Sequence, residues 1–240
     1  MSKESSAVET VLPPEAREGT FVVIPAFNEA GAIEQVARGV ADAYPNVVVV
    51  DDGSLDETGA AARRSAKYVL RHAINRGQGA AIQTGIEFAL KAGAKYIVTF
   101  DADGQHRVED IAALVGPIWR GECDVALGSR FLGEAEGLSS GRRMTLKLGV
   151  LFTRVTSGVK LTDTHNGLRA FSRAAAEQIE IKLDGMAHAS ELIDLIVRSG
   201  LTYKEVPVTV RYTAYSTAKG QSSRGAVRVA LHYLVGRMIR

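Results

Sequence analysis

The stretch Tyr96–His106, YIVTFDADGQH, places two carboxylates where an apolar strand ends. Its first five residues are apolar, aromatic or β-branched, which predicts a short strand buried in a sheet. Asp101 and Asp103 follow, and residues two apart on an extended chain point the same way, so these carboxylates can converge. Mg²⁺ takes one or two carboxylates together with waters and phosphate oxygens. The stretch therefore predicts a seat for a hard divalent cation. The alternative is an Asp-rich turn before a helix that begins near Val108.

Strand-like and helix-like segments alternate four times in the first 115 residues. Four short apolar runs predict the strands, and each is followed by a loop and a helical pattern. We expect strands at residues 20–24, 47–50, 67–70 and 96–100, and helices at about 31–44 and 57–65, up to about 92, and from 108. This order predicts an α/β fold with a Rossmann-like, mostly parallel sheet flanked by helices, joined by right-handed crossovers.

Polar residues follow three of these predicted strands. They are the pair Asn28-Glu29, the pair Asp51-Asp52, and Asp101 with Asp103. Ligands of such sheets bind beyond the carboxyl ends of the strands, so we expect the three groups to form one site. A capping pair for Asn28-Glu29 and a simple turn for Asp51-Asp52-Gly53 are the alternatives.

Three other nucleotide-binding classes fit the sequence poorly. A dinucleotide-binding domain needs G-x-G-x-x-G directly after its first strand, and the segment Pro25–Glu29, PAFNE, has no glycine. The P-loop pattern G-x-x-x-x-G-K-[ST] is absent. A nucleotidyltransferase also has a parallel sheet and paired acids, but its first loop is usually rich in glycine and arginine.

Composition bounds the remaining classes. The 240 residues are 46% hydrophobic with a mean hydropathy of +0.01, as in one large or two small soluble domains. A net charge of +2 argues against a nucleic-acid partner. The single cysteine, Cys123, excludes an internal disulfide, suits a reducing compartment and is expected to be buried. We expect residues 1–19 to be a flexible lead-in, and no run approaches the about 18 apolar residues of a membrane span.

Six motifs follow one another along residues 20–220. They are Val22–Glu29 (VVIPAFNE), Val50–Asp56 (VDDGSLD), Asn75–Ala80 (NRGQGA), Asp101–His106 (DADGQH), Gly128–Phe131 (GSRF) and Asp163–Arg169 (DTHNGLR). Each is weak alone, but in this order they resemble the family 2 glycosyltransferases of the GT-A fold. Within that family, the order and sequences of the motifs are most similar to those of dolichyl- or polyprenyl-phosphate mannose and glucose synthases.

The resemblance implies a donor side for a GDP- or UDP-linked sugar. The implied nucleotide-sugar residues are Pro25, Phe27, Asn28, Glu29, Asp51, Asp52, Gly77, Gly79 and Asp101. Lys219 is added to them from the sequence itself, because it opens a glycine-containing polar loop that could close over the donor diphosphate. Asp52 would bind the base or ribose, and Gly77 and Gly79 would let the backbone approach the nucleotide. Asp101, Asp103 and Gln105 would hold Mg²⁺ or Mn²⁺. A glutamine carbonyl is a reasonable ligand for such a hard cation.

The second half supplies the acceptor side. A strand is expected at 124–127, a mobile glycine- and serine-rich loop at 133–141, and an apolar helix at 146–159 that is either core or a lipid platform. We favour core with one exposed edge. The resemblance places Arg130 and one of Arg142 and Arg143 on an acceptor phosphate, for which a guanidinium is well shaped. A solvated helix start is the alternative for Arg142-Arg143.

The predicted reaction is a single displacement with inversion at the anomeric carbon. The predicted catalytic residues are Asp101, Asp103, Arg130 and Glu191. A polyprenyl phosphate needs no general base, whereas a sugar-hydroxyl acceptor needs one, with Glu191 or Asp163 as candidates. His188 and Glu191 form either an acid/base pair or a helix cap. A catalytically silent nucleotide-binding module is the remaining alternative.

The last part of the sequence is basic. We expect strand 201–212, broken by Pro207, to lie at a sheet edge, and residues 225–240 to form an amphipathic helix. This helix would either pack on the domain or lie on an anionic membrane. The predicted organisation is one GT-A domain at 20–222, with nucleotide-binding (20–115) and acceptor (116–222) halves, then a basic helix at 223–240. The predicted location is cytoplasmic, or peripheral on the inner membrane face through this helix or a partner protein.

Overall fold

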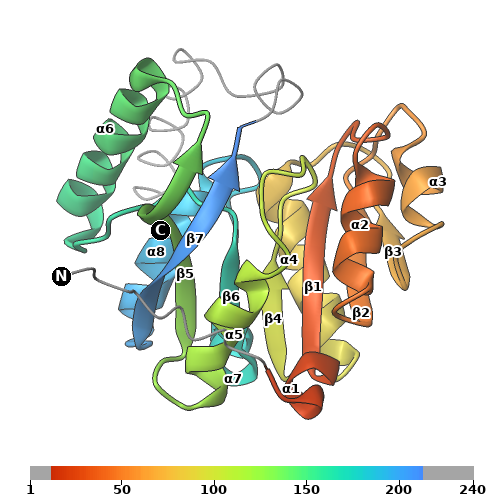
Figure 1. Ribbon diagram of the computed structural model, residues 1–240, viewed down its shortest axis with the longest axis horizontal. Helices are drawn as coiled ribbons and strands as arrows, with labels where there is room; N and C mark the ends of the chain where they lie inside the picture. Colours follow the sequence, from red (N-terminus) through yellow and green to blue (C-terminus); the bar gives the residue numbers. More distant parts are fainter. Residues whose placement is uncertain (1–11, 213–240) are drawn as a thin grey trace, which may run out of the picture.

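The four predicted N-terminal strands lie parallel in one sheet (Figure 1), as seen in a computed structural model that describes residues 12–212. These strands are β1 (Thr20–Ala26), β2 (Asn46–Asp51), β3 (Tyr68–Arg71) and β4 (Tyr96–Thr99). The second half adds β5 (Val125–Glu136), β6 (Arg169–Ser172) and β7 (Tyr203–Arg211), in the order β3-β2-β1-β4-β6-β5-β7. Only β6 runs antiparallel to its neighbours among the described strands. The predicted mostly parallel sheet is therefore confirmed.

Helices cover both faces of this sheet (Figure 1). They are α1 (Pro14–Glu18), α2 (Ile33–Ala41), α3 (Thr58–Ala62), α4 (Gln78–Lys91), α5 (Asp110–Trp119), α6 (Ser140–Ser157), α7 (Arg173–Gln178) and α8 (His188–Arg198). Because side chains alternate along a strand, Val22 and Ile24 of β1 pack with α2 and α5, whereas Val23 packs with α4. All seven residues of β1 are buried, as predicted for a strand covered on both faces.

Two segments predicted to be irregular are ordered. The lead-in expected to be flexible through residue 19 contains α1, and Leu12 and Ala16 are buried in the core. The loop expected at 133–141 begins as sheet, because β5 continues to Glu136 beside β7. Gly133 allows this pairing, since a Cβ there would lie 2.3 Å from the Val208 carbonyl oxygen.

The structure tests three further expectations. Cys123 is buried, as predicted. Pro207 lies on β7, which is at the sheet edge, so the missing N–H is tolerated there as predicted. The expectation that residues 146–159 are core with one exposed edge is wrong, because only Thr153 and Val159 are buried in this range.

Within residues 12–212, no helix is both long enough and apolar enough to cross a membrane. Lys219 and the predicted helix at 223–240 lie outside the described residues.

Candidate active site

The carboxyl ends of β1 and β2 lie side by side. Ala26 is in register with Asp51, and the Asp52 N–H donates to the Ala26 carbonyl over 2.8 Å. On the other side of β1, the Phe100 N–H donates to the Val23 carbonyl over 2.9 Å, so the chain entering Asp101 emerges at the same sheet edge. The structure thus places the three polar groups beyond neighbouring strands, as the strand order predicted.

The turn after β1 is fastened to the loop after β2. Asn28 has a φ of 54°, in the left-handed region, where an asparagine is tolerated better than most residues. Its Oδ1 accepts from the Leu55 N–H over 2.9 Å, and the Glu29 N–H donates to Thr58 Oγ1 over 2.7 Å. Pro25 is buried inside β1, whereas Phe27 is 42% exposed at the rim. Asn28 and Glu29 therefore shape the loop junction.

Asp52 organises the loop that follows β3. Its buried carboxylate accepts from the Arg76 N–H over 2.9 Å, from the Gly77 N–H over 2.6 Å and from Asn75 Nδ2 over 3.0 Å. His72 Nδ1 lies 2.7 Å from the same carboxylate. The Asp52 carboxylate already holds residues 72–77 in place. A base or ribose bound by Asp52, as predicted, would contact this same carboxylate. His72 was missed because it lies twenty residues away and in no quoted motif.

Asp51 has a similar, fully buried setting. Its Oδ1 accepts from the Ser54 N–H over 2.9 Å, and Arg71 Nε lies 3.5 Å from Oδ2. The helix start at Gly59 is close by, since a Cβ at that position would lie 2.7 Å from Asp51 Oδ2. Asp51 thus links β2, β3 and α3 and lies beneath the surface of the site.

Gly77 and Gly79 permit a close approach of protein backbone. A Cβ on Gly77 would lie 2.5 Å from the Asp184 carbonyl oxygen, and one on Gly79 would lie 2.1 Å from that of Leu183. The Gly79 N–H donates to the Asp184 carbonyl over 2.6 Å. These contacts let α4 begin against residues 183–185, and the role of the two glycines toward a nucleotide stays a prediction.

Asp101 sits at the centre of the site with partners on several elements. Its Oδ1 accepts from Gln78 Nε2 of α4 over 3.1 Å, and its Oδ2 lies 2.9 Å from His106 Nε2. Gly167 must be a glycine here, because a Cβ would lie 2.1 Å from Asp101 Oδ2. Gly167 is itself held in place, because Thr99 Oγ1 donates to its carbonyl oxygen over 2.6 Å. These contacts hold the carboxylate in one orientation.

The pKa values of Asp101 and Asp103 are shifted in opposite directions from their ordinary value. Burial raises the pKa of Asp101, but the hydrogen bond and charge of His106 and the charge of Arg169 outweigh it, so the net shift is downward. Burial and then the nearby Asp101 charge raise the pKa of Asp103 to about 6. A cation bound nearby would stabilise the charged form of Asp103, which burial and the Asp101 charge disfavour.

The donor set fits a divalent ion that keeps open positions. Asp103 Oδ1 accepts from the Gln105 N–H over 3.0 Å, and the Gln105 side chain is buried beside it. Among residues 12–212 no three His, Cys, Asp or Glu side chains converge as a complete metal site. Carboxylate and amide oxygens are ligand types that Mg²⁺ takes together with water and substrate phosphate.

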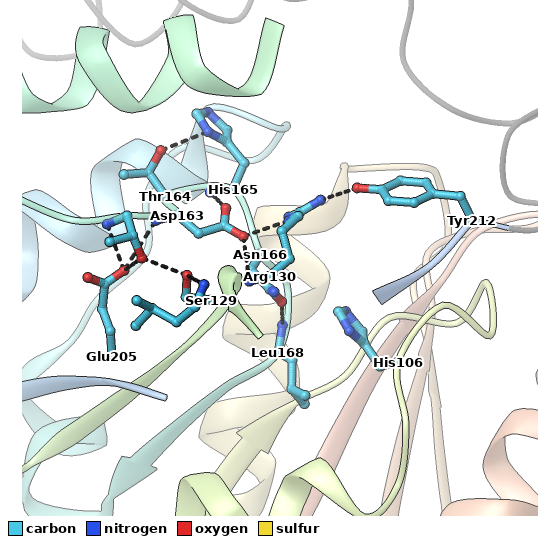
Figure 2. A network of polar contacts seen from close by, with 12 residues as sticks. His106, Ser129, Arg130, Asp163, Thr164, His165, Asn166, Leu168, Glu205 and Tyr212 are labelled. Atoms are coloured by element: carbon cyan, nitrogen blue, oxygen red, sulfur yellow. Dashed lines mark hydrogen bonds and ion pairs between the residues drawn. The ribbon is translucent and has the colours of Figure 1, made fainter. Parts of the chain in front are cut away.

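Two arginines gather at Tyr212, and Figure 2 shows one of them, Arg130, with its polar partners. Buried Arg130 donates through Nε to Asp163 Oδ2 over 2.6 Å and through Nη1 to the Tyr212 hydroxyl. Arg142, in the first turn of α6, places its guanidinium 4.9 Å from the centre of the Tyr212 ring. Arg130 and Arg142 thus meet at Tyr212, while Arg143 is exposed. Tyr212 itself was not predicted, because no local pattern distinguishes it.

Backbone contacts join the two sides. The Arg211 N–H donates to the Gln105 carbonyl over 2.9 Å, and the next residue is Tyr212. Arg169 is buried between them, and its pKa is lowered to about 10 by burial, against the opposing charges of Asp101 and Asp163. The anionic and cationic clusters are therefore neighbours in one site.

The Asp163–Arg169 motif forms the wall between β5 and α6. Glu205 Oε1 accepts from the Thr162 N–H over 2.8 Å, and Asn166 Oδ1 accepts from the Leu168 N–H over 2.9 Å (Figure 2). His165 reaches α6 at Gly149, where a Cβ would lie 2.7 Å from His165 Cε1. Burial lowers the pKa of His165 to about 4.

Glu191 and His188 have buried, structural surroundings. The two oxygens of Glu191 accept from the N–H groups of Lys182 and Leu183 over 3.0 and 2.8 Å. His188 Nδ1 lies 3.0 Å from the Gly185 carbonyl, and burial followed by the Arg169 charge lowers its pKa to about 4. These contacts order residues 182–185, a role that neither interpretation from sequence named. Within the described part of the chain, no side-chain hydrogen bond caps α8 at Ala187, and the acid/base role stays a prediction.

Comparisons with known proteins bear on this arrangement. Residues 21–180 match the family model described as Glycosyl transferase family 2. The chain is 32% identical to the UDP-N-acetylglucosamine–dolichyl-phosphate N-acetylglucosaminyltransferase of Methanococcus voltae, over 83% of this chain and 88% of the relative. It is 31% identical to the polyprenol monophosphomannose synthase of Mycolicibacterium smegmatis, over 99% and 96%.

Solved structures agree in fold. Glucosyl-3-phosphoglycerate synthase from Mycobacterium tuberculosis, crystallised with Mn²⁺, UDP-glucose and phosphoglyceric acid, superposes with a TM-score of 0.66. The sequences are 20% identical, and the match covers 91% of this chain and 81% of the neighbour. The GT-A fold predicted from the motifs is thereby confirmed. With two thirds of its length matched to the family and relatives above 30% identity along most of both chains, this chain belongs to glycosyl transferase family 2.

Proposed function

We propose that this chain transfers a hexose from a GDP- or UDP-linked sugar to a polyprenyl phosphate, with inversion at the anomeric carbon. One observation carries the proposal: the Asp101–Asp103 pair and the Arg130–Arg142 pair are neighbours, joined through Gln105 and residues 211–212. The first pair suits a cation-bound diphosphate and the second suits a phosphate monoester. The relatives named for polyprenol and dolichyl phosphate support this choice of acceptor.

The acceptor phosphate serves as its own nucleophile in this proposal. Its second pKa is about 6, so near neutrality it is largely dianionic and needs no general base. The two candidate bases for a hydroxyl acceptor are already engaged: Glu191 accepts two backbone N–H groups, and Asp163 is paired with Arg130. The oxygens of both carboxylates are therefore already directed at protein N–H donors. These contacts favour phosphate over a sugar hydroxyl.

In this proposal the aspartates bind the cation that stabilises the leaving group. Asp103, with Asp101 and Gln105 beside it, would hold Mg²⁺ or Mn²⁺, which supplies counter-charge to the departing nucleoside diphosphate when bound. His106 and Gln78 keep Asp101 oriented, and the Asp52-anchored loop 72–77 shapes the floor of the nucleotide side. Arg130, with Arg142 near it, places the attacking phosphate oxygen on the other side.

The test is a transfer assay with purified full-length protein. UDP-glucose, UDP-N-acetylglucosamine and GDP-mannose are each offered with a short-chain polyprenyl phosphate and Mg²⁺ or Mn²⁺, and with EDTA, and the products are identified by mass spectrometry. We expect one donor to give a polyprenyl-phosphate sugar, abolished by EDTA. Failure of every donor would overturn the proposal.

A variant separates the two acceptor classes. We expect Glu191→Gln to retain activity within about tenfold on polyprenyl phosphate, because no base is required there, whereas loss of a general base costs about a hundredfold or more. Far-ultraviolet circular dichroism checks that the variant folds. A folded Glu191→Gln variant that has lost transfer would point to a hydroxyl acceptor.

A further inference from the structure

The helix α6 carries an apolar stripe that the domain does not cover. Met144, Leu148, Leu151 and Val155 are 61%, 58%, 55% and 77% exposed. At roughly 100° per residue these four positions fall on one narrow face, and Thr153, the buried residue of the helix, lies on the opposite face. In Figure 1 the helix stands at the margin of the molecule, beyond β5, rather than over the sheet.

The charges around this stripe have one sign. Residues 137–162 contain no aspartate or glutamate, and they include the basic residues Arg142, Arg143, Lys147, Arg154 and Lys160. Plotted on the same helix, Arg143, Lys147 and Arg154 form a ridge along one side of the apolar stripe. An apolar face bordered by basic side chains is the pattern of a helix that lies in a membrane interface.

We infer that the stripe of α6 docks on an anionic lipid bilayer, with the basic ridge against the lipid headgroups. This rests on the proposed function, because it presents the site to a membrane-embedded acceptor. The same helix reaches the site: Arg142, in the first turn of α6, stacks on Tyr212, which holds Arg130. Arg142 lies on the face of α6 opposite the stripe, on the same side as Thr153, so the helix would stand between the bilayer and the two arginines of the site.

A second copy of this chain fits the face less well. Two copies meeting through the same stripe would also bring their basic ridges together, and like charges across an interface are unfavourable. An anionic surface neutralises the ridge instead. The bilayer is therefore the occupant that both the apolar and the charged parts of the face favour.

Vesicle partitioning of the full-length chain, without donor or acceptor, tests this directly. The vesicles are phosphatidylcholine alone, or phosphatidylcholine with about a third phosphatidylglycerol. We expect Leu148→Gln with Leu151→Gln to weaken partitioning roughly tenfold or more, because two leucines no longer enter the interface. Val197→Gln, which changes an exposed residue on α8, is the control and should partition like the wild type.

The charge contribution is tested separately. Each basic residue near an anionic surface is worth about fivefold, so Lys147→Gln with Arg154→Gln should lower binding to the anionic vesicles about 25-fold and leave binding to neutral vesicles little changed. Lys91→Gln with Arg198→Gln removes the same number of charges from exposed positions on α4 and α8 and should have little effect.

Transfer assays distinguish this inference from the proposed function. We expect the α6 variants to keep wild-type activity on a water-soluble short-chain prenyl phosphate and to lose it on a long-chain polyprenyl phosphate embedded in vesicles. Inactivity of the wild type on both acceptors would sink the proposed function while leaving the partitioning result intact. Variants of α6 that partition like the wild type would overturn the inference. So would a change from dimer to monomer in size-exclusion chromatography, because the face would then join two copies.

Discussion

At the end of β2, buried carboxylates are held by backbone N–H groups, whereas on the acceptor side an eighteen-residue helix buries one side chain. Asp52 accepts from the N–H groups of Arg76 and Gly77, so its position is set by the main chain. Arg142 is placed by stacking on one ring, on a helix that contacts the domain mainly through α8. A hydrogen bond from the main chain fixes the geometry of a site with little loss of side-chain entropy. Ordering a long side chain such as arginine costs more of this entropy. The proposed donor side is therefore held by main-chain contacts, and the proposed acceptor side relies on arginine and tyrosine side chains.

The largest expected effect is on the stability of the donor side. Asp52→Ala leaves two backbone N–H groups, an amide and an imidazole without their buried acceptor, which should cost about 3 to 5 kcal/mol. Urea unfolding monitored by circular dichroism measures this. Asp42→Ala, at an exposed position after α2, should change stability by less than about 0.5 kcal/mol. If the two substitutions lowered the free energy of unfolding equally, the claim that Asp52 holds this side of the site in place would be wrong.

A smaller effect is expected where α4 begins. Gly79→Ala places a Cβ 2.1 Å from the Leu183 carbonyl oxygen, so the backbone must shift, at a cost of about 1 to 3 kcal/mol. Gly39→Ala, in α2 with nothing within 4 Å of the added Cβ, should instead stabilise the protein by about 0.5 to 1 kcal/mol. Thermal melts of both variants decide the matter. If Gly79→Ala melts at or above the wild-type temperature, residues 183–185 are not packed as described.

On the acceptor side the effect should fall on affinity. Tyr212→Phe removes the hydroxyl that accepts from Arg130, and we expect KM for the polyprenyl phosphate to rise roughly tenfold, with KM for the donor unchanged. Tyr212→Leu also removes the ring beneath Arg142 and should raise it further. Steady-state kinetics with each substrate varied in turn provide the measurement. A parallel rise in donor KM would show that the two sides are not separable.

A further effect, absent near neutral pH, concerns acid stability near α6. Burial lowers the pKa of His165 from an ordinary 6.5 to about 4, so the unfolded chain binds a proton first as pH falls. The contribution of His165 to stability is therefore complete above pH 6.5 and is lost toward pH 4, by up to about 1.4 kcal/mol per pH unit. His188 shifts in the same direction, so His165→Asn should flatten the pH dependence without abolishing it. Unfolding curves at several pH values test this, and unchanged slopes would contradict it.

Much of the donor side follows from sequence because its signals are local. A buried β-branched run such as Val47–Val50 predicts its own strand, and the polar residues after it fall at the sheet edge where ligands bind. What sequence could not show was the partner of each group. Gly79 signals a close approach without saying whether backbone or ligand is approached, and His72 reaches Asp52 only through the folding of β2 against β3.

The acceptor side was harder to predict because the same pattern fits different surroundings. The run Leu168–Phe171 indicates a strand but not its direction, and β6 turns out antiparallel. An apolar helical stretch has the same spacing whether it packs on a core or faces outward, so the exposure of Leu148 and Val155 required the structure. Tyr212 becomes informative only once β7 places it beside Arg130.

The separation of the two sides is tested most directly by paired binding titrations. Calorimetry would measure the cognate nucleoside diphosphate with Mn²⁺, and a short-chain polyprenyl phosphate, on the wild type, Asp103→Ala and Arg142→Ala. We predict that Asp103→Ala loses metal-dependent nucleotide binding and keeps the lipid phosphate, while Arg142→Ala weakens the lipid phosphate roughly tenfold and keeps the nucleotide. Nucleotide binding by Asp103→Ala equal to the wild type, or loss of both ligands in either variant, would contradict the account.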